Sequence, residues 1–148
     1  MKILYVDMDN VLVDFKSGID RVSKEIQSEY ENRLDEVPSI FSLMEPMPQA
    51  VESYNYLAAH FDTYILSTVP WLNPSAWSDK LLWVQKHLGE SAYKRLILSH
   101  HKNLNDGHYL IDDRTKNGAD RFRGEHIHFG TSKFPNWTSV VDYLKVIK

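Results

Sequence analysis

Residues 3–14 read Ile-Leu-Tyr-Val-Asp-Met-Asp-Asn-Val-Leu-Val-Asp, a short apolar run that stops abruptly at acidic side chains. A continuous apolar run of this length is typical of a strand that is buried on both faces of a parallel sheet. Residues 125–129 alternate in polarity and predict an edge strand. Three further apolar runs resemble the first, at residues 64–66, 95–98 and 109–111. The sequence therefore predicts a parallel sheet built around residues 3–6.

Stretches with helical spacing separate these runs. Apolar residues recur at intervals of three and four at Val51, Tyr54, Leu57 and Ala58, and the same spacing repeats at Leu81, Val84, Gln85 and Leu88, of which Gln85 is polar. A last helix is expected from about residue 136 or 138 to residue 147. Strands that alternate with helices predict an α/β fold, with a parallel sheet flanked by helices on both faces.

One segment departs from this alternation. Residues 15–45 are polar and charged, with helical propensity over residues 21–34. Pro38, Pro46 and Pro48 interrupt the stretch too often for a single helix. We expect a small helical cap, inserted after the first strand over the strand ends. The alternative is one long crossover helix with a ragged end. Residues 1–148 are otherwise expected to form a single domain.

Composition excludes several classes of function. The chain has 148 residues, a formal net charge of −3 and no cysteine. The missing cysteines exclude disulfide scaffolds, thiolate zinc sites and cysteine catalysis. The weak negative charge argues against binding to a nucleic-acid polymer. The N-terminal apolar run is too short for a signal peptide, and no segment is apolar enough to span a membrane. A cytoplasmic protein with a small-molecule ligand is the expectation.

Four carboxylates follow two of the predicted strands. Asp7 and Asp9 come directly after the first strand, and Asp112 and Asp113 follow residues 109–111. Ligands of open α/β sheets bind beyond the carboxyl ends of the strands, so neighbouring strands would bring these acids together. Clustered carboxylates need a cation, and oxygen ligands without cysteine favour a hard ion. Mg²⁺ fits best, because it leaves coordination positions for water and phosphate.

Three more residues are candidates for the same crevice. Ser67 closes the strand at residues 64–66, and Thr68 follows it. Their hydroxyl and backbone donors are suited to holding a phosphate oxygen. Lys102 lies ten residues before Asp112. A lysine among carboxylates is suited to holding phosphate against the negative field.

These residues resemble the four motifs of the haloacid dehalogenase (HAD) superfamily of phosphatases. Residues 7–12 are similar to its first motif, Asp-x-Asp-x-(Thr/Val), and Ser67 matches the second. Lys102 matches the third motif, and Asp112-Asp113 the fourth. The resemblance implies a Rossmann-like sheet and a magnesium-dependent phosphomonoesterase.

A closer resemblance is to the 5′(3′)-deoxyribonucleotidases. It rests on residues 7–15, on Glu-Pro-Met-Pro at 45–48, on Leu-Ile-Asp-Asp-Arg at 110–114, and on the spacing from Lys102 to Asp112. Asn10 replaces a common glycine, which the turn should tolerate because Asn accepts unusual backbone angles. The insertion is shorter than in the animal enzymes and lacks the aromatic cluster of their nucleoside pocket. The implied substrate is a (deoxy)nucleoside monophosphate.

The resemblance also implies a role for each residue. Asp7 would form an aspartyl-phosphate, and Asp9 would act as general acid and then as general base. Mg²⁺ would be held by the Asp7 carboxylate, the Asp9 backbone carbonyl and Asp113, with Asp112 orienting a metal-bound water. With Asp9 protonated, the charges of Mg²⁺ and Lys102 balance the other three carboxylates. The site would then be near neutral and admit a phosphate dianion.

Phe15, Phe41 and Arg114 are candidates for the substrate pocket. Other readings stay open at this point. The nearest alternative is an enzyme that performs the same reaction on another small phosphomonoester, such as a sugar phosphate. A phospho-accepting receiver domain also gathers acids and a lysine around Mg²⁺, although its phospho-acceptor should follow a middle strand, where this chain has Ser67. A catalytically silent binding protein that kept the site is a third possibility.

Overall fold

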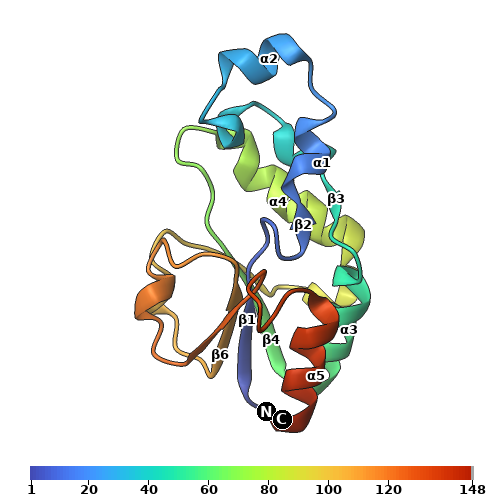
Figure 1. Cartoon of the computed structure of the whole chain (residues 1–148), viewed down its shortest axis with the longest axis vertical. Coiled ribbons are helices and arrows are strands. Elements are labelled where there is room, and N and C mark those ends of the chain that lie inside the picture. Colours follow the sequence, from blue (N-terminus) through green and yellow to red (C-terminus); the bar gives the residue numbers. More distant parts are fainter. Residues whose placement is uncertain (148) are drawn as a thin grey trace.

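The structure is a computed structural model, and it describes residues 1–147. A five-stranded parallel sheet with the strand order β5-β4-β1-β6-β7 forms its centre (Figure 1). The strands are β1 (Ile3–Val6), β4 (Asp62–Ser67), β5 (Leu96–Leu98), β6 (Tyr109–Asp112) and β7 (Glu125–His128). All five predicted strands are present, and β7 is the edge strand that its alternating sequence predicted.

The pairing register brings the ends of the central strands level. Val6, the last residue of β1, is aligned with Ile65 of β4 and with Ile111 of β6. The backbone N–H of Asp7 donates to the Ile111 carbonyl at 2.9 Å, which extends the pairing one residue beyond β1. Chain segments that leave β1, β4 and β6 therefore start from one edge of the sheet.

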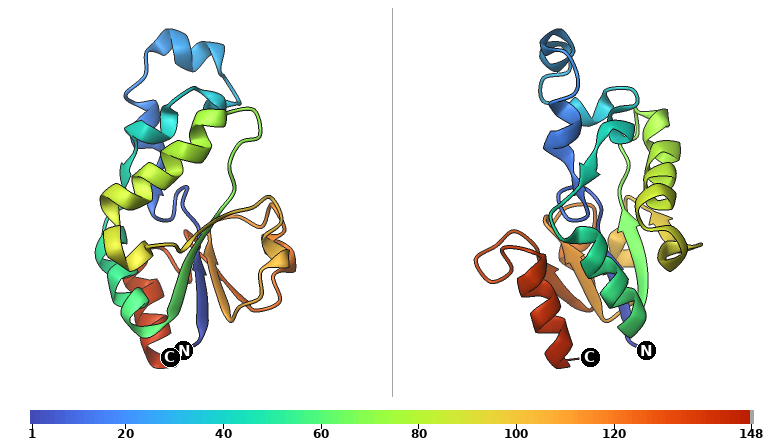
Figure 2. Two further views of the ribbon diagram at one scale, coloured as in Figure 1. Left: turned by 180° about the vertical axis from the view of Figure 1, so that it is seen from behind. Right: turned by 90° about the vertical axis from the view of Figure 1, so that its right-hand side faces the viewer.

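The two faces of the sheet are covered differently. Leu4 and Val6 contribute to the larger core, which packs against α3 (Ala50–His60) and α5 (Trp137–Ile147). These two helices lie side by side on one face (Figure 2). On the other face, Tyr5 packs in a smaller cluster with residues such as Phe122. That face carries the short 3-10 helices η4 (Lys102–Leu104) and η5 (Ala119–Arg121).

The insertion, residues 15–45, lies beyond the carboxyl edge of the sheet, at the top of Figure 1. Its helices are α1 (Phe15–Ile19), α2 (Lys24–Glu29), η1 (Leu34–Glu36) and η2 (Ile40–Leu43). The helical segment expected over residues 21–34 is shorter, because α2 covers only Lys24–Glu29, and the left-handed conformation of Asn32, with φ of 66°, keeps the chain from continuing as a helix beyond it. A two-stranded antiparallel pair, β2 (Val13–Asp14) with β3 (Glu45–Pro46), joins the insertion to the sheet.

The helix α4 (Pro74–His87) runs from the insertion down toward β5, and η3 (Gly89–Ala92) follows it. Its buried residues are Ala76, Lys80, Trp83 and Val84. Leu81, which the spacing pattern placed inward, is 45% exposed. The inward face of α4 is thus rotated from the predicted one. Within residues 1–147, no helix is long and apolar enough to span a membrane, including α4 with its 14 residues.

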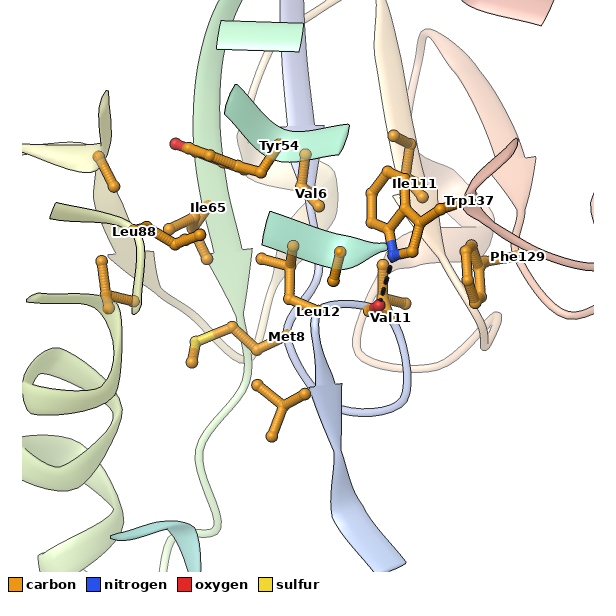
Figure 3. Close-up of a cluster of buried hydrophobic side chains, with 14 of the residues drawn as sticks. Val6, Met8, Val11, Leu12, Tyr54, Ile65, Leu88, Ile111, Phe129 and Trp137 are labelled. Atoms are coloured by element: carbon orange, nitrogen blue, oxygen red, sulfur yellow. Dashed lines mark hydrogen bonds between the residues drawn. The ribbon is translucent and has the colours of Figure 1, made fainter. Parts of the chain in front are cut away.

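Trp137 anchors the loop that follows β1 (Figure 3). Its side chain is 1% exposed, and its Nε1 donates to the Val11 carbonyl at 2.8 Å.

We expect Trp137→Phe to lower the free energy of unfolding by about 1–3 kcal/mol, because the Val11 carbonyl loses its buried donor. Denaturant unfolding measures this loss. Trp77→Phe, at a side chain that is 38% exposed, is the matched control and should change stability by no more than about 0.5 kcal/mol. Equal effects of the two substitutions would contradict the anchoring role.

Candidate active site

Asp7 and Asp9 leave the carboxyl end of β1 in a tight turn. The backbone N–H groups of Leu12 and Val13 both donate to the Met8 carbonyl, at 2.9 Å each. Asn10 has φ of 61°, in the left-handed region that asparagine tolerates, as expected from the sequence. The turn holds both carboxyl groups at the edge of the sheet where a ligand of an open α/β fold would bind.

The second acidic pair arrives from β6, the neighbour of β1. Carboxylate oxygens of Asp7, Asp112 and Asp113 all lie within 4.8 Å of one another. Burial and the nearby Asp7 charge raise the pKa of Asp113 to about 7 and that of Asp112 to about 6. Ionised carboxylates at this spacing are unfavourable without a cation. The oxygen donors and the crowding of negative charge fit a hard divalent ion.

Lys102 lies against the same carboxylates and is 3% exposed. Its Nζ donates to Asp7 Oδ1 at 3.0 Å and to Asp112 Oδ2 at 2.6 Å. Burial alone would lower the pKa of Lys102, but the two carboxylates outweigh it and the pKa is raised. Lys102 is therefore a permanent positive charge at the site. Its backbone N–H donates to the Asn117 carbonyl at 2.7 Å, which fixes η4 beside the strand ends.

Both carboxylate oxygens of Asp112 already accept hydrogen bonds from the protein. Its Oδ2 accepts from Lys102, and its Oδ1 accepts from the backbone N–H of Arg114 at 2.9 Å. Its side chain is 3% exposed. Both residues line the pocket beside Asp7, but the neighbouring Asp113 is less buried. This difference favours Asp113 as the ligand and Asp112 as its support.

Ser67 and Thr68 occupy different depths. Ser67 is fully buried, and its Oγ accepts a hydrogen bond from Lys80 Nζ at 2.8 Å. Thr68 lines the pocket, while its Oγ1 donates to the Ser99 carbonyl at 2.8 Å. Direct contact between Ser67 and a phosphate stays a prediction.

Lys80 is a site residue that sequence reasoning missed. It belongs to α4, is 0% exposed, and its Nζ lies 3.1 Å from Asp9 Oδ2. The sequence does carry a signal for it, because Lys80 shares a helical face with Ala76 and Trp83. Its positive charge also corrects the charge balance expected from Lys102 alone. With Asp9 protonated and a divalent cation bound, the site carries a net positive charge, which favours a dianion.

A pocket of about 360 Å³ opens over these residues. Its floor includes Asp7, Asp9, Lys102, Asp112 and Asp113. The insertion supplies part of the wall, through Phe15, Asn32, Leu34 and Asp35, and Arg114, Lys116 and Asn117 line the pocket as well. A space of this size suits a small molecule.

Phe15 and Arg114 line this pocket as the sequence suggested, whereas Phe41 does not. Phe41 is 2% exposed and packs edge-on behind Phe15, with the ring centroids 5.9 Å apart. It lies in the apolar core between η2 and α4, where its ring is removed from water. Phe41 therefore supports the pocket wall from behind.

Comparison with known proteins places this site in a family. The family model described as "5' nucleotidase, deoxy (Pyrimidine), cytosolic type C protein" matches residues 27–141. A relative from Vibrio phage KVP40, assigned the name 5′(3′)-deoxyribonucleotidase, is 65% identical over 96% of this chain and 84% of its own. The human cytosolic-type 5′(3′)-deoxyribonucleotidase is 27% identical over 92% of this chain and 77% of its own.

The fold has a counterpart among solved structures. A haloacid dehalogenase-like family hydrolase from Xanthomonas campestris superimposes with a TM-score of 0.62, covering 99% of this chain and 96% of its own at 8% identity. That similarity establishes the HAD-like fold. The family match decides against the receiver-domain reading of the acidic cluster. The chain belongs to the 5′(3′)-deoxyribonucleotidase family and is a phosphoric monoester hydrolase.

Proposed function

We propose that this enzyme removes the phosphate group from deoxyribonucleoside monophosphates through a phosphorylated Asp7, with Mg²⁺ as its cofactor. The observation that carries the proposal is the meeting of Asp7, Asp112 and Asp113 with Lys102 at the ends of β1 and β6. The names of the relatives supply the substrate class.

In the first step, a carboxylate oxygen of Asp7 forms a bond to phosphorus while the ester P–O bond breaks. The electron pair of that bond passes to the leaving oxygen of the nucleoside, which takes a proton from Asp9. Lys102 lies 3.0 Å from Asp7 Oδ1 and offsets the negative charge that the phosphoryl group brings. The products of this step are the nucleoside and an aspartyl-phosphate.

In the second step, water attacks the phosphorus of the aspartyl-phosphate. Asp9 accepts the proton of that water, and the bond from phosphorus to the Asp7 oxygen breaks to release inorganic phosphate. With this proton Asp9 returns to the protonated state in which it began the first step. Burial raises the pKa of Asp9 although Lys80 acts to lower it, and the raised pKa favours this protonated state.

A magnesium ion would be held by the Asp7 carboxylate, the Asp9 backbone carbonyl and Asp113, supported by Asp112. When bound, it supplies positive charge that lets a carboxylate approach a phosphate dianion. The crowding of Asp7, Asp112 and Asp113 within 4.8 Å supports the carboxylate part of this donor set.

Residues 15–45 serve as a cap in this proposal. Phe15, Asn32, Leu34 and Asp35 of the insertion all line the pocket above the carboxylates. A nucleoside bound by its phosphate would lie against these residues, with Phe15 as the aromatic contact. The small cap would leave part of the nucleoside facing solvent.

A substrate panel tests the proposal. We expect kcat/KM to be highest for deoxyribonucleoside monophosphates, such as dUMP and dTMP or their 3′-phosphate isomers. Sugar phosphates should be poorer substrates, because they reach less of the wall that the insertion supplies. Release of inorganic phosphate measures each rate in the presence of Mg²⁺. A higher kcat/KM for a sugar phosphate than for every nucleotide would refute the assigned substrate class.

A further inference from the structure

Lys80 is the most unusual charged residue outside the predicted motifs. It lies in the middle of α4, on the face that carries Ala76, Trp83 and Val84, and it is 0% exposed. Burying an ammonium group is costly unless it is paired and fully hydrogen-bonded. A lysine in this position therefore needs compensating partners.

Those partners belong to the candidate active site. Lys80 Nζ donates to Asp9 Oδ2 at 3.1 Å, to Ser67 Oγ at 2.8 Å and to the Thr68 carbonyl at 2.8 Å. An ammonium group has three N–H donors, so these contacts use all of them. The group is held from three directions and cannot turn toward a bound phosphate without losing one of the contacts.

The geometry also fixes Asp9. Oδ2 of Asp9 is bound to Lys80, whereas Oδ1 is buried and finds no hydrogen-bond partner within residues 1–147. The anchored oxygen sets the orientation of the whole group, because rotation about the Asp9 side chain would break the contact with Lys80.

The same helix ties the insertion to this arrangement. Lys80 Nζ lies 4.7 Å from the centroid of the Phe41 ring, a cation–π contact with η2. Nδ2 of Asn73 donates to the Asp35 carbonyl at 2.9 Å, and Nε1 of Trp83 donates to the Met44 carbonyl at 3.0 Å. α4 thus contacts the insertion on both sides of Lys80. The place of η2 and the place of Asp9 are linked through one ammonium group.

We propose that Lys80 is a positioning residue, which holds Asp9 in the orientation for proton transfer to the leaving oxygen and links that orientation to the seating of the insertion through Phe41. The inference rests on the proposed function. Lys80 is buried, and the residues that line the pocket within 1–147 do not include it, so its role is distinct from that of Lys102. It acts through Asp9 and not through contact with the substrate.

Two leaving groups separate this role from a purely structural one. The nucleoside of dUMP leaves as an alkoxide and needs a proton, whereas p-nitrophenyl phosphate releases a stable phenolate without one. We expect Lys80→Met to slow the phosphorylation step with dUMP by about 100-fold. The burst of p-nitrophenol in rapid-mixing experiments should keep its rate within about threefold. KM for dUMP should also change by less than about threefold, since a positioning residue outside the pocket adds no ground-state binding.

One control variant changes another lysine of α4, and a second changes the ring that contacts Lys80. Lys86→Met removes an exposed lysine of α4 and should leave both rates unchanged. Phe41→Leu keeps an apolar side chain but loses the ring, and should show the same selective loss to a smaller extent. If Lys80→Met does not unfold cooperatively, Lys80→Gln, which keeps a donor, is the substitute, with the same expectation.

The outcomes that would overturn the inference are distinct. Equal losses with both leaving groups would assign Lys80 to the stability of the site as a whole. A raised KM with unchanged kcat would make it a substrate ligand. Unchanged rates for dUMP would remove any role. If the unmodified enzyme does not hydrolyse dUMP, the proposed function itself fails, whereas an active enzyme with an unselective Lys80→Met refutes only the role of Lys80.

Discussion

Asp7→Asn is expected to abolish phosphatase turnover, by roughly four orders of magnitude or more, while the fold survives. The carboxylate of Asp7 is the proposed nucleophile, and a neutral amide oxygen does not take its place. Lys102 keeps its contact with Asp112 at 2.6 Å, so one of its two partners remains. Steady-state release of phosphate from dUMP measures the loss, and circular dichroism checks the fold.

The matched control is Asp106→Asn. Asp106 has a side chain that is 74% exposed and pairs with Arg123 at the surface. Exposed pairs contribute little to stability, so this substitution should preserve both activity and fold. Acid quenching with labelled substrate should also trap a phosphorylated protein in the unmodified enzyme and not in Asp7→Asn. Near-normal turnover by Asp7→Asn would show that another group takes the phosphate.

Removal of Mg²⁺ by a chelator is expected to have an effect of similar size on turnover. Without a divalent ion, Asp7, Asp112 and Asp113 face an incoming dianion, and the charges of Lys80 and Lys102 do not outweigh theirs. Repulsion between like charges is strong in a site of low dielectric. Turnover should fall to background in EDTA and recover when Mg²⁺ is added in excess. Full activity in excess chelator would exclude the metal from the reaction.

Mg²⁺ should also raise the melting temperature of the protein by an amount that depends on pH. Burial raises the pKa of Asp113 to about 7 and of Asp112 to about 6, above the unfolded values of about 4. The metal-free folded protein therefore binds more protons than the unfolded chain, and its stability falls as pH rises from about 4 through about 7. Mg²⁺ binds the ionised carboxylates. The rise in Tm on adding Mg²⁺ should thus be larger at about pH 8 than at about pH 5. An equal rise at both pH values would contradict the assigned metal ligands.

Much of the fold could be predicted because its decisive elements are local in the sequence. The strands β1, β4 and β6 are largely buried on both faces, so each contains a continuous apolar run. The acidic residues follow two of these runs directly, and the parallel arrangement alone brings them to one edge. The convergence of Asp7 with Asp112 was predictable for this reason.

The site features that the sequence did not predict depend on contacts between distant segments. Lys80 is inward because Asp9, Ser67 and Thr68 meet above α4, and none of these contacts is visible in the spacing of α4 itself. A helix pattern that counts only apolar residues places a lysine in solvent. Phe41 was a candidate for the substrate pocket, but the packing of η2 against α4 buries it. Side-chain partners across elements decided both cases.

The paired strands β2 and β3 give the insertion a narrow neck. Val13 lies opposite Pro46, Asp14 lies opposite Glu45, and the backbone N–H of Met47 donates to the Leu12 carbonyl at 2.8 Å. Both ends of the insertion therefore leave the carboxyl edge of the sheet at one point. The length of the insertion can change without moving the strands beneath it. Exchange of the insertion between relatives would change the pocket wall above the carboxylates, and Asp9 would keep its orientation only where the new insertion offers Lys80 a contact like that of Phe41.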